Sequence, residues 1–381
     1  MKEETTLLIT VVLVLTLVGI LMVYSASAVG GNDRGLLIRQ LFYVGVGVVL
    51  MFGAARFDYH RFTDKFVFRV MLLTGIGMLL LVLVPGIGIE VDGARRWLGI
   101  SGITRFQPSE VAKFVLILWL AAKLSQNREH GREFFRGFFP PVAVTCLFAG
   151  LVLAERDLGI PAMMLGVAGI MMFVAGIRWH YLALSIAPAA ALAVGLVAFF
   201  PHRVRRIFAF VNPWDYRDDA GWQLIQGYSA FARGGVLGSG AGAGEQKLFY
   251  LPAAHTDFIF PVVGEELGLA GTLTVVALFG VFAWAAYRIA KHAPDNFGGL
   301  LASGIACMIS LQAAFIMAVT TGLLPTKGLP LPFISYGGTA LAVFLGMVGV
   351  LINISIQASV PESHRVRAHG NSLTAAVRGI S

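Results

Sequence analysis

The sequence predicts an all-α polytopic membrane protein of about ten transmembrane helices with one long, structured extracytoplasmic loop. Of its 381 residues, 57% are apolar and only 13% are charged, against about 25% charged in soluble domains. The apolar residues form continuous runs, and the mean hydropathy is +0.78. These features exclude a soluble enzyme, a disordered chain and a fibrous repeat. They also argue against an outer-membrane barrel, whose strands alternate apolar and polar residues.

Ten apolar runs are the predicted spans. The first is interpreted as a retained helix and not as a signal peptide, because the next span begins too soon after it to leave a polar mature N-terminus. The spans lie at about 6–26, 37–55, 66–85, 108–124, 138–154, 159–177, 180–200, 258–287, 298–320 and 336–358.

An even number of spans places both termini on one side of the membrane. The loops on that side carry more Lys and Arg than the opposite short loops, so the positive-inside rule predicts cytoplasmic termini. The chain then forms one membrane domain over residues 1–381, with a cytoplasmic tail at 359–381. The net charge of +8 is attributed to this bias or to an anionic membrane substrate, and not to nucleic-acid binding.

A long link over residues 201–257 is predicted to lie on the extracytoplasmic face. It contains two amphipathic stretches, at 205–211 and 223–232, and then a glycine-rich turn region at 234–244. The positive-inside rule disfavours Lys and Arg on the extracytoplasmic face, so their presence there suggests an anionic partner. Alternatively, the last helices set the orientation of the chain in the membrane whatever the charge of this link. The basic residues of the link are Arg203, Arg205, Arg206, Arg217, Arg233 and Lys247.

Ionisable residues in or beside the spans cost about 2.5–3.5 kcal/mol each on insertion scales, and they are therefore functional candidates. Glu110 and Lys113 begin the fourth span three residues apart, so they share a helix face and can pair. They form either a structural ion pair or the charged wall of an internal cavity.

A second polar set surrounds Asp257, which enters the eighth span from the long link, two residues after His255. A carboxylate there can face a water-filled crevice while its surroundings raise its pKa, as a general base near neutral pH requires. A helix N-cap is the alternative. Glu265 and Glu266 lie about two turns deeper. At least one is expected to pair with a cation such as Lys113 or an arginine, in the cavity or in a purely structural role.

A third polar set is the segment 322–338, which contains three prolines and four glycines and so cannot form a regular helix. Irregular backbone near membrane depth is tolerated only where protein or a water-lined cavity covers it. A re-entrant or tightly packed outer loop is predicted, with a simple turn as the alternative. Its one fixed charge, Lys327, is a candidate phosphate contact, and Ser335 is a further candidate for substrate binding.

Between the third and fourth spans, Arg95 and Arg96 precede Trp97 in a predicted loop at 92–99. Arginine suits bidentate phosphate recognition; the alternative is a mere anchor at the membrane interface.

Cys146 and Cys307 are expected to be packed or lipid-facing thiols, and two cysteines cannot form a metal cluster. Together the polar sets predict a cationic crevice on the outer face with one carboxylate, which fits an anionic lipid-linked substrate better than an ion.

The same residues show a resemblance that covers nearly the whole chain. The sequence resembles the SEDS family (shape, elongation, division and sporulation proteins). It is more similar to the division branch than to the elongation branch, and the sporulation branch is also close. The matching segments are MVYSASA at 22–28, DGARRW at 92–97, FQPSEVAK at 106–113, NPW at 212–214, GWQLIQ at 221–226, 246–268 with AHTDFIF and GEELG, and 322–338 with LPTKG and PFISYGG.

The resemblance implies a peptidoglycan glycosyltransferase that polymerises lipid II, the undecaprenyl-pyrophosphate-linked disaccharide pentapeptide, on the outer face of the bacterial cytoplasmic membrane. It implies a class B penicillin-binding protein as transpeptidase partner, beside other membrane proteins of the division or elongation machinery. It permits a divalent cation such as Mg or Mn. Asp257 matches the family's essential aspartate, and Glu110 and Lys113 match charged residues of its central cavity.

Two places depart from the family pattern: Ala253 stands where Glu is frequent, and Arg156 and residues 160–161 are unusual.

We hypothesise an inverting transfer in which Asp257 takes a proton from the acceptor hydroxyl while fixed cations stabilise the leaving pyrophosphate. Alternatives are a lipid II flippase, an elongation-type polymerase and a scaffold that activates a synthase. The candidate cations are Arg95, Arg96, Lys113, Arg203, Arg206, Arg233 and Lys327.

Overall fold

The computed structural model describes residues 1–27, 33–91, 93–100, 104–127, 133–248, 251–252 and 254–359. Asp92, Ala253 and residues 360–381 of the predicted tail lie outside this part of the chain. Each predicted span coincides with one helix. These helices are α1 (Lys2–Ser27), α2 (Asp33–Arg56), α3 (Lys65–Leu83), α4 (Pro108–Gln126), α5 (Phe139–Ala154), α6 (Gly159–Val174), α7 (Trp179–Ala198), α10 (Ile259–Lys291), α11 (Asn296–Thr320) and α12 (Thr339–Ala358).

The predicted helical membrane body is confirmed. Within the described residues, seven helical stretches are long and apolar enough to cross a membrane by length and composition. The apolar helices within α6 and α7 are shorter, and α4 carries Glu110 and Lys113 in its first turns. The number of ten crossings therefore stays a prediction.

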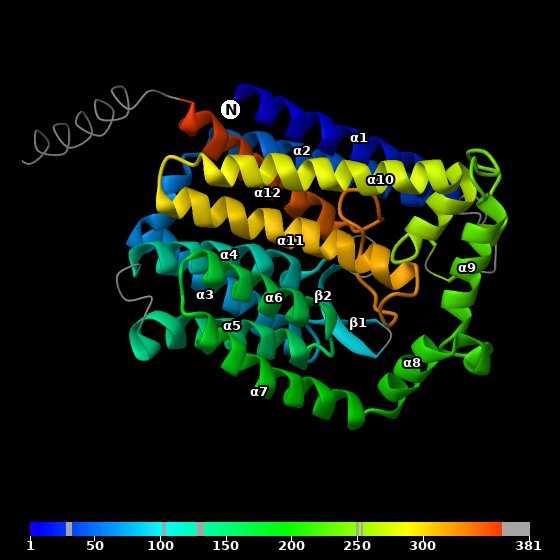
Figure 1. Ribbon diagram of the computed structural model, residues 1–381, viewed down its shortest axis with the longest axis horizontal. Helices are drawn as coiled ribbons and strands as arrows, with labels where there is room; N and C mark the ends of the chain where they lie inside the picture. The colour runs from blue at the N-terminus through cyan, green and yellow to red at the C-terminus, as the bar shows by residue number, and fades with distance from the viewer. Residues whose placement is uncertain are drawn as a thin grey trace, which may run out of the picture.

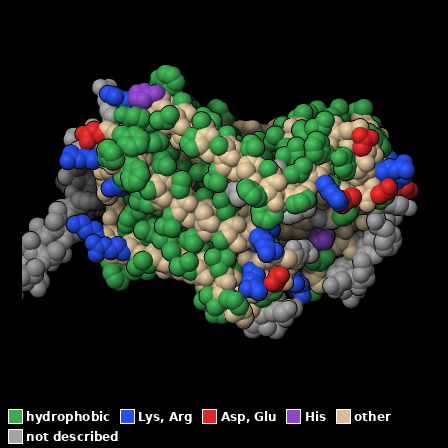
Figure 2. All heavy atoms as spheres, turned by 90° about the horizontal axis from the view of Figure 1, so that it is seen from below, with side chains coloured by type: hydrophobic (Ala, Val, Ile, Leu, Met, Phe, Trp, Pro, Cys, Tyr) green, Lys and Arg blue, Asp and Glu red, His purple; other side chains and the backbone are tan. Residues whose placement is uncertain are grey.

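The helices run roughly side by side along the long axis of the molecule (Figure 1). The N-terminus and the C-terminal end of α12 lie at one end, whereas β1, α8 and α9 lie at the opposite end, which we call the loop end. Figure 2 shows apolar side chains over the middle of one face and charged side chains gathered toward its two ends. This distribution is expected of a body whose middle faces lipid.

The all-α prediction is incomplete, because the link between α3 and α4 forms a small antiparallel sheet. β1 (Ile89–Val91) pairs with β2 (Ala94–Ile100), which pairs with β3 (Thr104–Phe106). The loop predicted at 92–99 is thus largely strand β2. Such short strands carry too few residues for a recognisable alternation of apolar and polar side chains, so the sequence did not indicate them.

Both amphipathic stretches of the long link are helices. They form α8 (Pro201–Val211) and α9 (Trp222–Gly234), which the 3₁₀ turn η4 (Pro213–Tyr216) joins. A second 3₁₀ turn, η5 (Gln246–Leu248), follows the glycine-rich region.

The glycine-rich region lies along the first turns of α10. Ser239 and Gly240 donate their backbone N–H groups to the carbonyls of Glu265 and Glu266, at 2.9 and 3.0 Å. A Cβ on Gly238, whose φ is +82°, would lie 2.1 Å from the Glu266 carbonyl oxygen. Only glycine permits this conformation and this close approach.

The carboxylates of Glu265 and Glu266 fix the same region. Glu265 accepts backbone N–H groups from Glu245 at 2.8 Å and from Gln246 at 3.1 Å. Glu266 forms a buried ion pair with Lys247 at 2.7 Å. One glutamate does pair with a cation, as expected, but the partner is Lys247 and not Lys113 or an arginine. Both side chains have a structural role.

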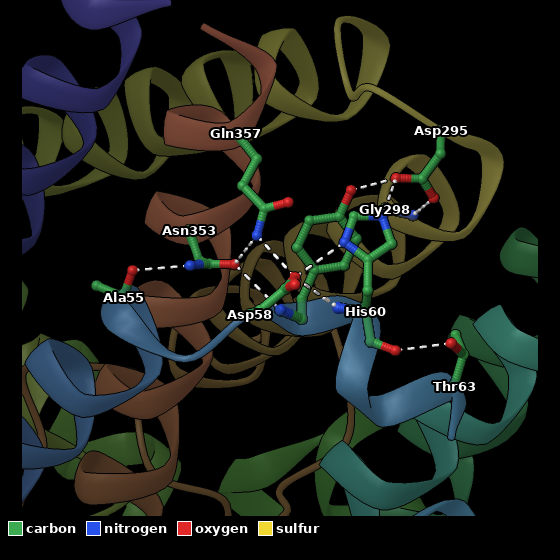
Figure 3. A network of polar contacts seen from close by, with 9 residues as sticks. Ala55, Asp58, His60, Thr63, Asp295, Gly298, Asn353 and Gln357 are labelled. Atoms are coloured by element: carbon green, nitrogen blue, oxygen red, sulfur yellow. Dashed lines mark hydrogen bonds and ion pairs between the residues drawn. The ribbon is translucent and has the colours of Figure 1, made fainter. Parts of the chain in front are cut away.

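A polar network joins three segments at the end that carries the N-terminus and the C-terminal end of α12 (Figure 3). His60, in the turn η1 (Tyr59–Thr63) between α2 and α3, contacts Asp58 at 2.9 Å and Asp295 at 3.1 Å. Gln357 of α12 donates to Asp58 at 2.8 Å and to Asn353 at 3.0 Å. The hydrogen bond with Asp295, and then that with Asp58, raises the pKa of His60 against the opposing effect of burial.

Replacing Lys247 by Met should destabilise the protein strongly, because it leaves the Glu266 carboxylate buried without its cation. Breaking a buried pair in this way costs about 3–5 kcal/mol. Arg233→Gln is the matched control, since its pair with Glu245 is exposed and exposed pairs contribute about 0–1 kcal/mol. The thermal unfolding midpoint in detergent should fall clearly for K247M and hardly for R233Q; equal shifts would contradict the structural role of Lys247.

Candidate active site

A cavity of about 570 Å³ lies at the loop end of the molecule, within the size range of small-ligand sites. We call it the loop-end cavity. Its wall combines α2, the sheet, the start of α4, the link between α5 and α6, and the segments that precede α10 and α12. Among the residues that border it are Arg39, Tyr43, Arg96, Arg105, Glu110, Asp157, His255, Asp257 and Tyr336.

A second cavity, of about 810 Å³, is larger but carries no comparable chemistry. It lies between the C-terminal parts of α4, α6 and α10 and the N-terminal part of α11. It holds none of the predicted site residues, and its one carboxylate, Asp295, already binds His60. We therefore assign the candidate site to the loop-end cavity.

Asp257 lies in the turn that precedes α10, and it borders the cavity. The N-cap residue of α10 is Phe258, so Asp257 is not the helix cap that the sequence left open. A Cβ on Gly328 would lie 2.6 Å from Asp257 Oδ2, so the segment 322–338 packs directly against the carboxylate. This glycine keeps the carboxylate accessible.

The surroundings of Asp257 shift its pKa toward neutrality. Burial, and then the negative charge of Asp157, raises the pKa of Asp257 to about 6. This pKa suits a general base that works near neutral pH. The positive charges that oppose the shift are those of Arg206, Arg96 and Lys327.

Asp157 is a second carboxylate of the cavity, and only 2% of it is exposed. Its Oδ1 accepts the backbone N–H of Gly159 at 2.7 Å, at the start of α6. Asp157 also lies 3.5 Å from Arg96 Nη1 and 3.8 Å from Lys327 Nζ. It thereby brings together two cations that the sequence predicted separately.

Arg96 also binds the backbone of the link between α5 and α6. Its Nε donates to the carbonyl of Glu155 at 3.3 Å, and its Nη2 donates to that of Arg156 at 3.1 Å. Arg156 has a φ of +63°, which is uncommon for a residue with a Cβ. Its guanidinium donates to the Gly93 carbonyl at 2.8 Å. The unusual Arg156 thus adds a contact between this link and the sheet.

The side chain of Glu155 lies beside this cluster. It is 1% exposed, and neither of its carboxyl oxygens has a hydrogen-bond partner within the described residues. Burial, and then the charge of Asp157, raises the pKa of Glu155 to about 8. The group is therefore protonated at neutral pH.

Glu110 and Lys113 pair at 2.8 Å, and both are buried. Lys113 Nζ also donates to Gln312 Oε1 at 2.9 Å and lies 4.9 Å from the ring centre of Phe344. Gln312 in turn donates to the Pro330 carbonyl at 2.8 Å. Both interpretations left open by the sequence hold in part: the pair is structural, and Glu110 borders the cavity.

The arginines of α8 act on the site through their charge. Arg206 lowers the pKa of both Asp257 and Lys327, and Arg203 lowers that of Lys327. Neither is among the residues that border the cavity. The guanidinium of Arg203 lies over the Phe200 ring, 4.2 Å from its centre.

Two predicted cations lie elsewhere. Arg95 pairs with Glu90 at 3.2 Å between β1 and β2, and both are exposed. Neighbouring side chains on a strand point to opposite faces, which separates Arg95 from Arg96. Arg233 pairs with Glu245 beside the glycine-rich region. Neither borders the loop-end cavity.

Ser335 and His255 support the turn that carries Asp257. The Ser335 hydroxyl donates to the Thr256 carbonyl at 2.6 Å and accepts the Leu331 N–H at 2.8 Å. The His255 carbonyl accepts the N–H of Tyr336 at 2.9 Å. Burial lowers the pKa of His255, so its ring is neutral at physiological pH.

The carboxylates that border the cavity do not by themselves form a metal-binding cluster. Within the described residues, no group of three or more His, Cys, Asp and Glu side chains converges. Asp157 and Asp257 are the two aspartates of the cavity, and the first already faces Arg96 and Lys327. The mechanism proposed below contains no metal-dependent step.

Besides Asp157, sequence reasoning missed four polar residues of the cavity. Arg105 and Tyr336 were not singled out because they belong to a short link and to a proline-rich segment. For Arg39 and Tyr43 of α2 a signal existed, because Arg39 is an ionisable residue inside a predicted span. All four border the cavity.

Comparison with known proteins gives consistent results. Residues 5–360 match the family model FTSW_RODA_SPOVE, described as a cell cycle protein. The chain is 43% identical over 356 residues to a probable peptidoglycan glycosyltransferase FtsW of Geobacter sp. (strain M18), covering 90% of this chain and 94% of that protein. It is 39% identical over 355 residues to the stage V sporulation protein E of Bacillus subtilis (strain 168), covering 92% and 96%.

Solved structures show the same fold. A chain of a peptidoglycan synthase complex that coordinates polymerization and crosslinking superposes with a TM-score of 0.78 at 29% identity, covering 93% of this chain and 98% of that one. The rod shape determining protein RodA of Thermus thermophilus superposes with a TM-score of 0.69 at 27% identity, covering 93% and 97%.

Replacing Glu155 by Gln should stabilise the protein increasingly as the pH rises. The pKa of Glu155 is higher in the folded chain than in the unfolded chain. The contribution of Glu155 to the free energy of unfolding is therefore complete at low pH and is lost as the pH rises toward 8. Gln stays neutral throughout. The unfolding midpoint of E155Q should exceed that of wild type more at about pH 8 than at about pH 5. The exposed Glu133→Gln serves as control, and a gain independent of pH would contradict the protonated state.

Proposed function

This chain belongs to the SEDS family of cell cycle proteins, and we propose that it is a peptidoglycan glycosyltransferase that polymerises lipid II into glycan strands of the septal wall. The activity is the one named for its relatives. The observation that carries the proposal is a carboxylate, Asp257, with a pKa of about 6 in a cavity whose wall is cationic. Identity of 43% to a protein named FtsW and of 27% to RodA favours the division branch.

In the proposed reaction, Asp257 acts as general base. Its carboxylate accepts the proton of the 4-hydroxyl on the terminal GlcNAc of the acceptor lipid II. The hydroxyl oxygen forms a bond to the anomeric carbon of MurNAc in the growing strand. The bond from that carbon to the diphosphate oxygen breaks, undecaprenyl diphosphate leaves with the electron pair, and the configuration at the carbon inverts. Asp257 then returns its proton to water.

The leaving diphosphate concentrates negative charge beside the reacting carbon. Fixed cations in a poorly hydrated site stabilise such charge without reorganisation. Arg96 and Lys327 are held there by Asp157, and the charges of Arg206 and Arg203 act from α8. Arg96 and Lys327 are the proposed diphosphate contacts, and Arg203 and Arg206 add positive charge from a greater distance.

The buried ion pair beside the cavity favours a polymerase over a flippase. A flippase needs access from both leaflets, whereas Lys113, whose partner Glu110 borders the cavity, is 0% exposed and bound to Glu110 and Gln312. We place the cavity on the extracytoplasmic face and the termini in the cytoplasm. The related chain of known structure belongs to a complex that also crosslinks peptidoglycan, and we propose a class B penicillin-binding protein as the corresponding partner here.

Replacing Asp257 by Asn should abolish polymerisation, because the amide cannot accept the proton while its shape is retained. Gel analysis of products from lipid II, with the transpeptidase partner copurified, measures the loss; general bases contribute about 10²–10⁴-fold. In wild type, activity should fall as the pH drops through about 6, where Asp257 becomes protonated. Full activity of D257N with its partner present would disprove the assignment.

Replacing Arg96 by Gln should weaken lipid II use far more than replacing Arg95 by Gln does. The two residues are neighbours on β2, but only Arg96 borders the cavity, whereas Arg95 pairs with Glu90. Rates at low lipid II concentration should fall by about tenfold or more for R96Q and stay near wild type for R95Q. Membrane insertion, followed by membrane fractionation, should be equal. Equal losses of activity would indicate that both arginines only anchor the sheet.

A further inference from the structure

The cations that act on the loop-end cavity fall into two groups. The first consists of Arg96, Arg206 and Lys327, whose charges act on Asp257; Arg96 and Lys327 both face Asp157. The second is the pair Arg39 and Arg105, whose charges act instead on the hydroxyl of Tyr336. We call them the Asp257 cluster and the Arg39–Arg105 pair. The proposed reaction has so far used only the first.

The Arg39–Arg105 pair is built from different elements than the Asp257 cluster. Arg39 belongs to α2, and its side chain hydrogen-bonds the Tyr336 hydroxyl. Arg105 belongs to β3, and its carbonyl accepts the hydroxyls of Tyr43 at 2.9 Å and Thr339 at 3.3 Å. The strand is thereby held between α2 and α12. Arg39 and Arg105 are both exposed, and both border the cavity.

A short chain of non-covalent contacts links the pair to the turn that carries Asp257. Tyr336 donates its backbone N–H to the carbonyl of His255 at 2.9 Å, and the two rings lie 6.0 Å apart. His255 precedes Asp257 by two residues. The Arg39–Arg105 pair therefore borders the same cavity as Asp257, but neither arginine is among the charges that shift the pKa of Asp257.

The chemistry of the proposed reaction requires two sites for a diphosphate at different distances from the base. In the donor, the diphosphate is attached to the anomeric carbon that reacts, so it must lie beside Asp257. In the acceptor, the reacting 4-hydroxyl is on the far sugar, so a whole disaccharide separates it from its own diphosphate. The second diphosphate must therefore lie farther away, where its lipid still reaches the membrane.

We propose that the Arg39–Arg105 pair, with Tyr43 and Tyr336, is the subsite for the diphosphate of the acceptor, and that the Asp257 cluster is the subsite for that of the donor. The inference rests on the proposed function. Arginine pairs suit a diphosphate because each planar guanidinium offers parallel N–H donors to phosphate oxygens. The start of α2, one of the predicted spans, supplies Arg39, which places the subsite beside the membrane.

The test separates the two substrates with two analogues of lipid II. In the donor-only analogue, the terminal 4-hydroxyl is replaced by hydrogen. In the acceptor-only analogue, a methylene group replaces the anomeric oxygen, so the diphosphate cannot leave. Together they yield a single product, a lipid-linked tetrasaccharide, and the KM of each is measured at saturation of the other with the transpeptidase partner present.

For the double variant R39Q/R105Q, we expect the KM of the acceptor-only analogue to rise about tenfold or more and that of the donor-only analogue to change less than about twofold. Lys327→Gln should show the opposite pattern. The matched control is Arg95→Gln, an arginine of the same sheet whose partner is Glu90; it should change neither KM. Tyr43→Phe removes only a hydroxyl that holds the Arg105 carbonyl, and it should raise the acceptor KM to a smaller extent.

The outcomes distinguish this inference from the proposed function. If wild type makes no tetrasaccharide, the proposed function fails. If wild type is active and R39Q/R105Q and Tyr43→Phe leave the acceptor KM unchanged, or raise the donor KM instead, the subsite assignment is wrong. The kinetics are repeated in vesicles of zwitterionic lipid alone. An effect that disappears there would show that the pair binds anionic phospholipid, and would overturn the assignment.

Discussion

The buried ion pair between Glu110 and Lys113 is the interaction on which the geometry of the site depends. An ammonium group in the helical core must be fully paired, because an uncompensated buried charge costs several kcal/mol. Lys113 meets this requirement with Glu110 and with Gln312, whose amide holds the Pro330 carbonyl. The pair therefore fixes the irregular segment 322–338. That segment in turn places Gly328 against the carboxylate of Asp257.

The same principle shapes the long link. Glu265 and Glu266 lie in the first turns of α10, where ionised groups need partners, and they bind the glycine-rich region through backbone N–H groups and Lys247. Lys247 also donates to Ser25 Oγ of α1 at 2.6 Å. Carboxylates that face the interior thus hold a 57-residue stretch of polar chain, residues 201–257, onto the helices. With its end fixed in this way, the link holds α8 and its arginines at the loop end.

Much of this architecture could be predicted from the sequence, because a membrane imposes long apolar runs and makes each ionisable exception visible. Asp257, Glu110 and Lys113 were found in this way. Arg96 and Arg95 were not told apart, since their difference arises from a strand too short to show a pattern.

Asp157 and Arg39 illustrate what requires coordinates. Asp157 was not singled out from the sequence, although it binds Arg96 and Lys327. Arg39 was passed over as a residue inside a span. Each gains its role from partners on other elements, which no spacing along one segment indicates. The positions of the cavity-facing residues relative to one another are therefore a property of the packed helices and not of any single motif.

The charge balance around Asp257 reconciles two opposing demands. A leaving diphosphate needs cations beside the reacting carbon, but those cations lower the pKa of the carboxylate and make it a weaker base. Asp157 offsets this effect, because its negative charge raises the pKa of Asp257 while it holds Arg96 and Lys327 in place. Placing the acceptor diphosphate on a separate pair of arginines serves the same end, since its cations then stay away from the base. The site can hold two diphosphates and still keep a carboxylate that accepts a proton near neutral pH.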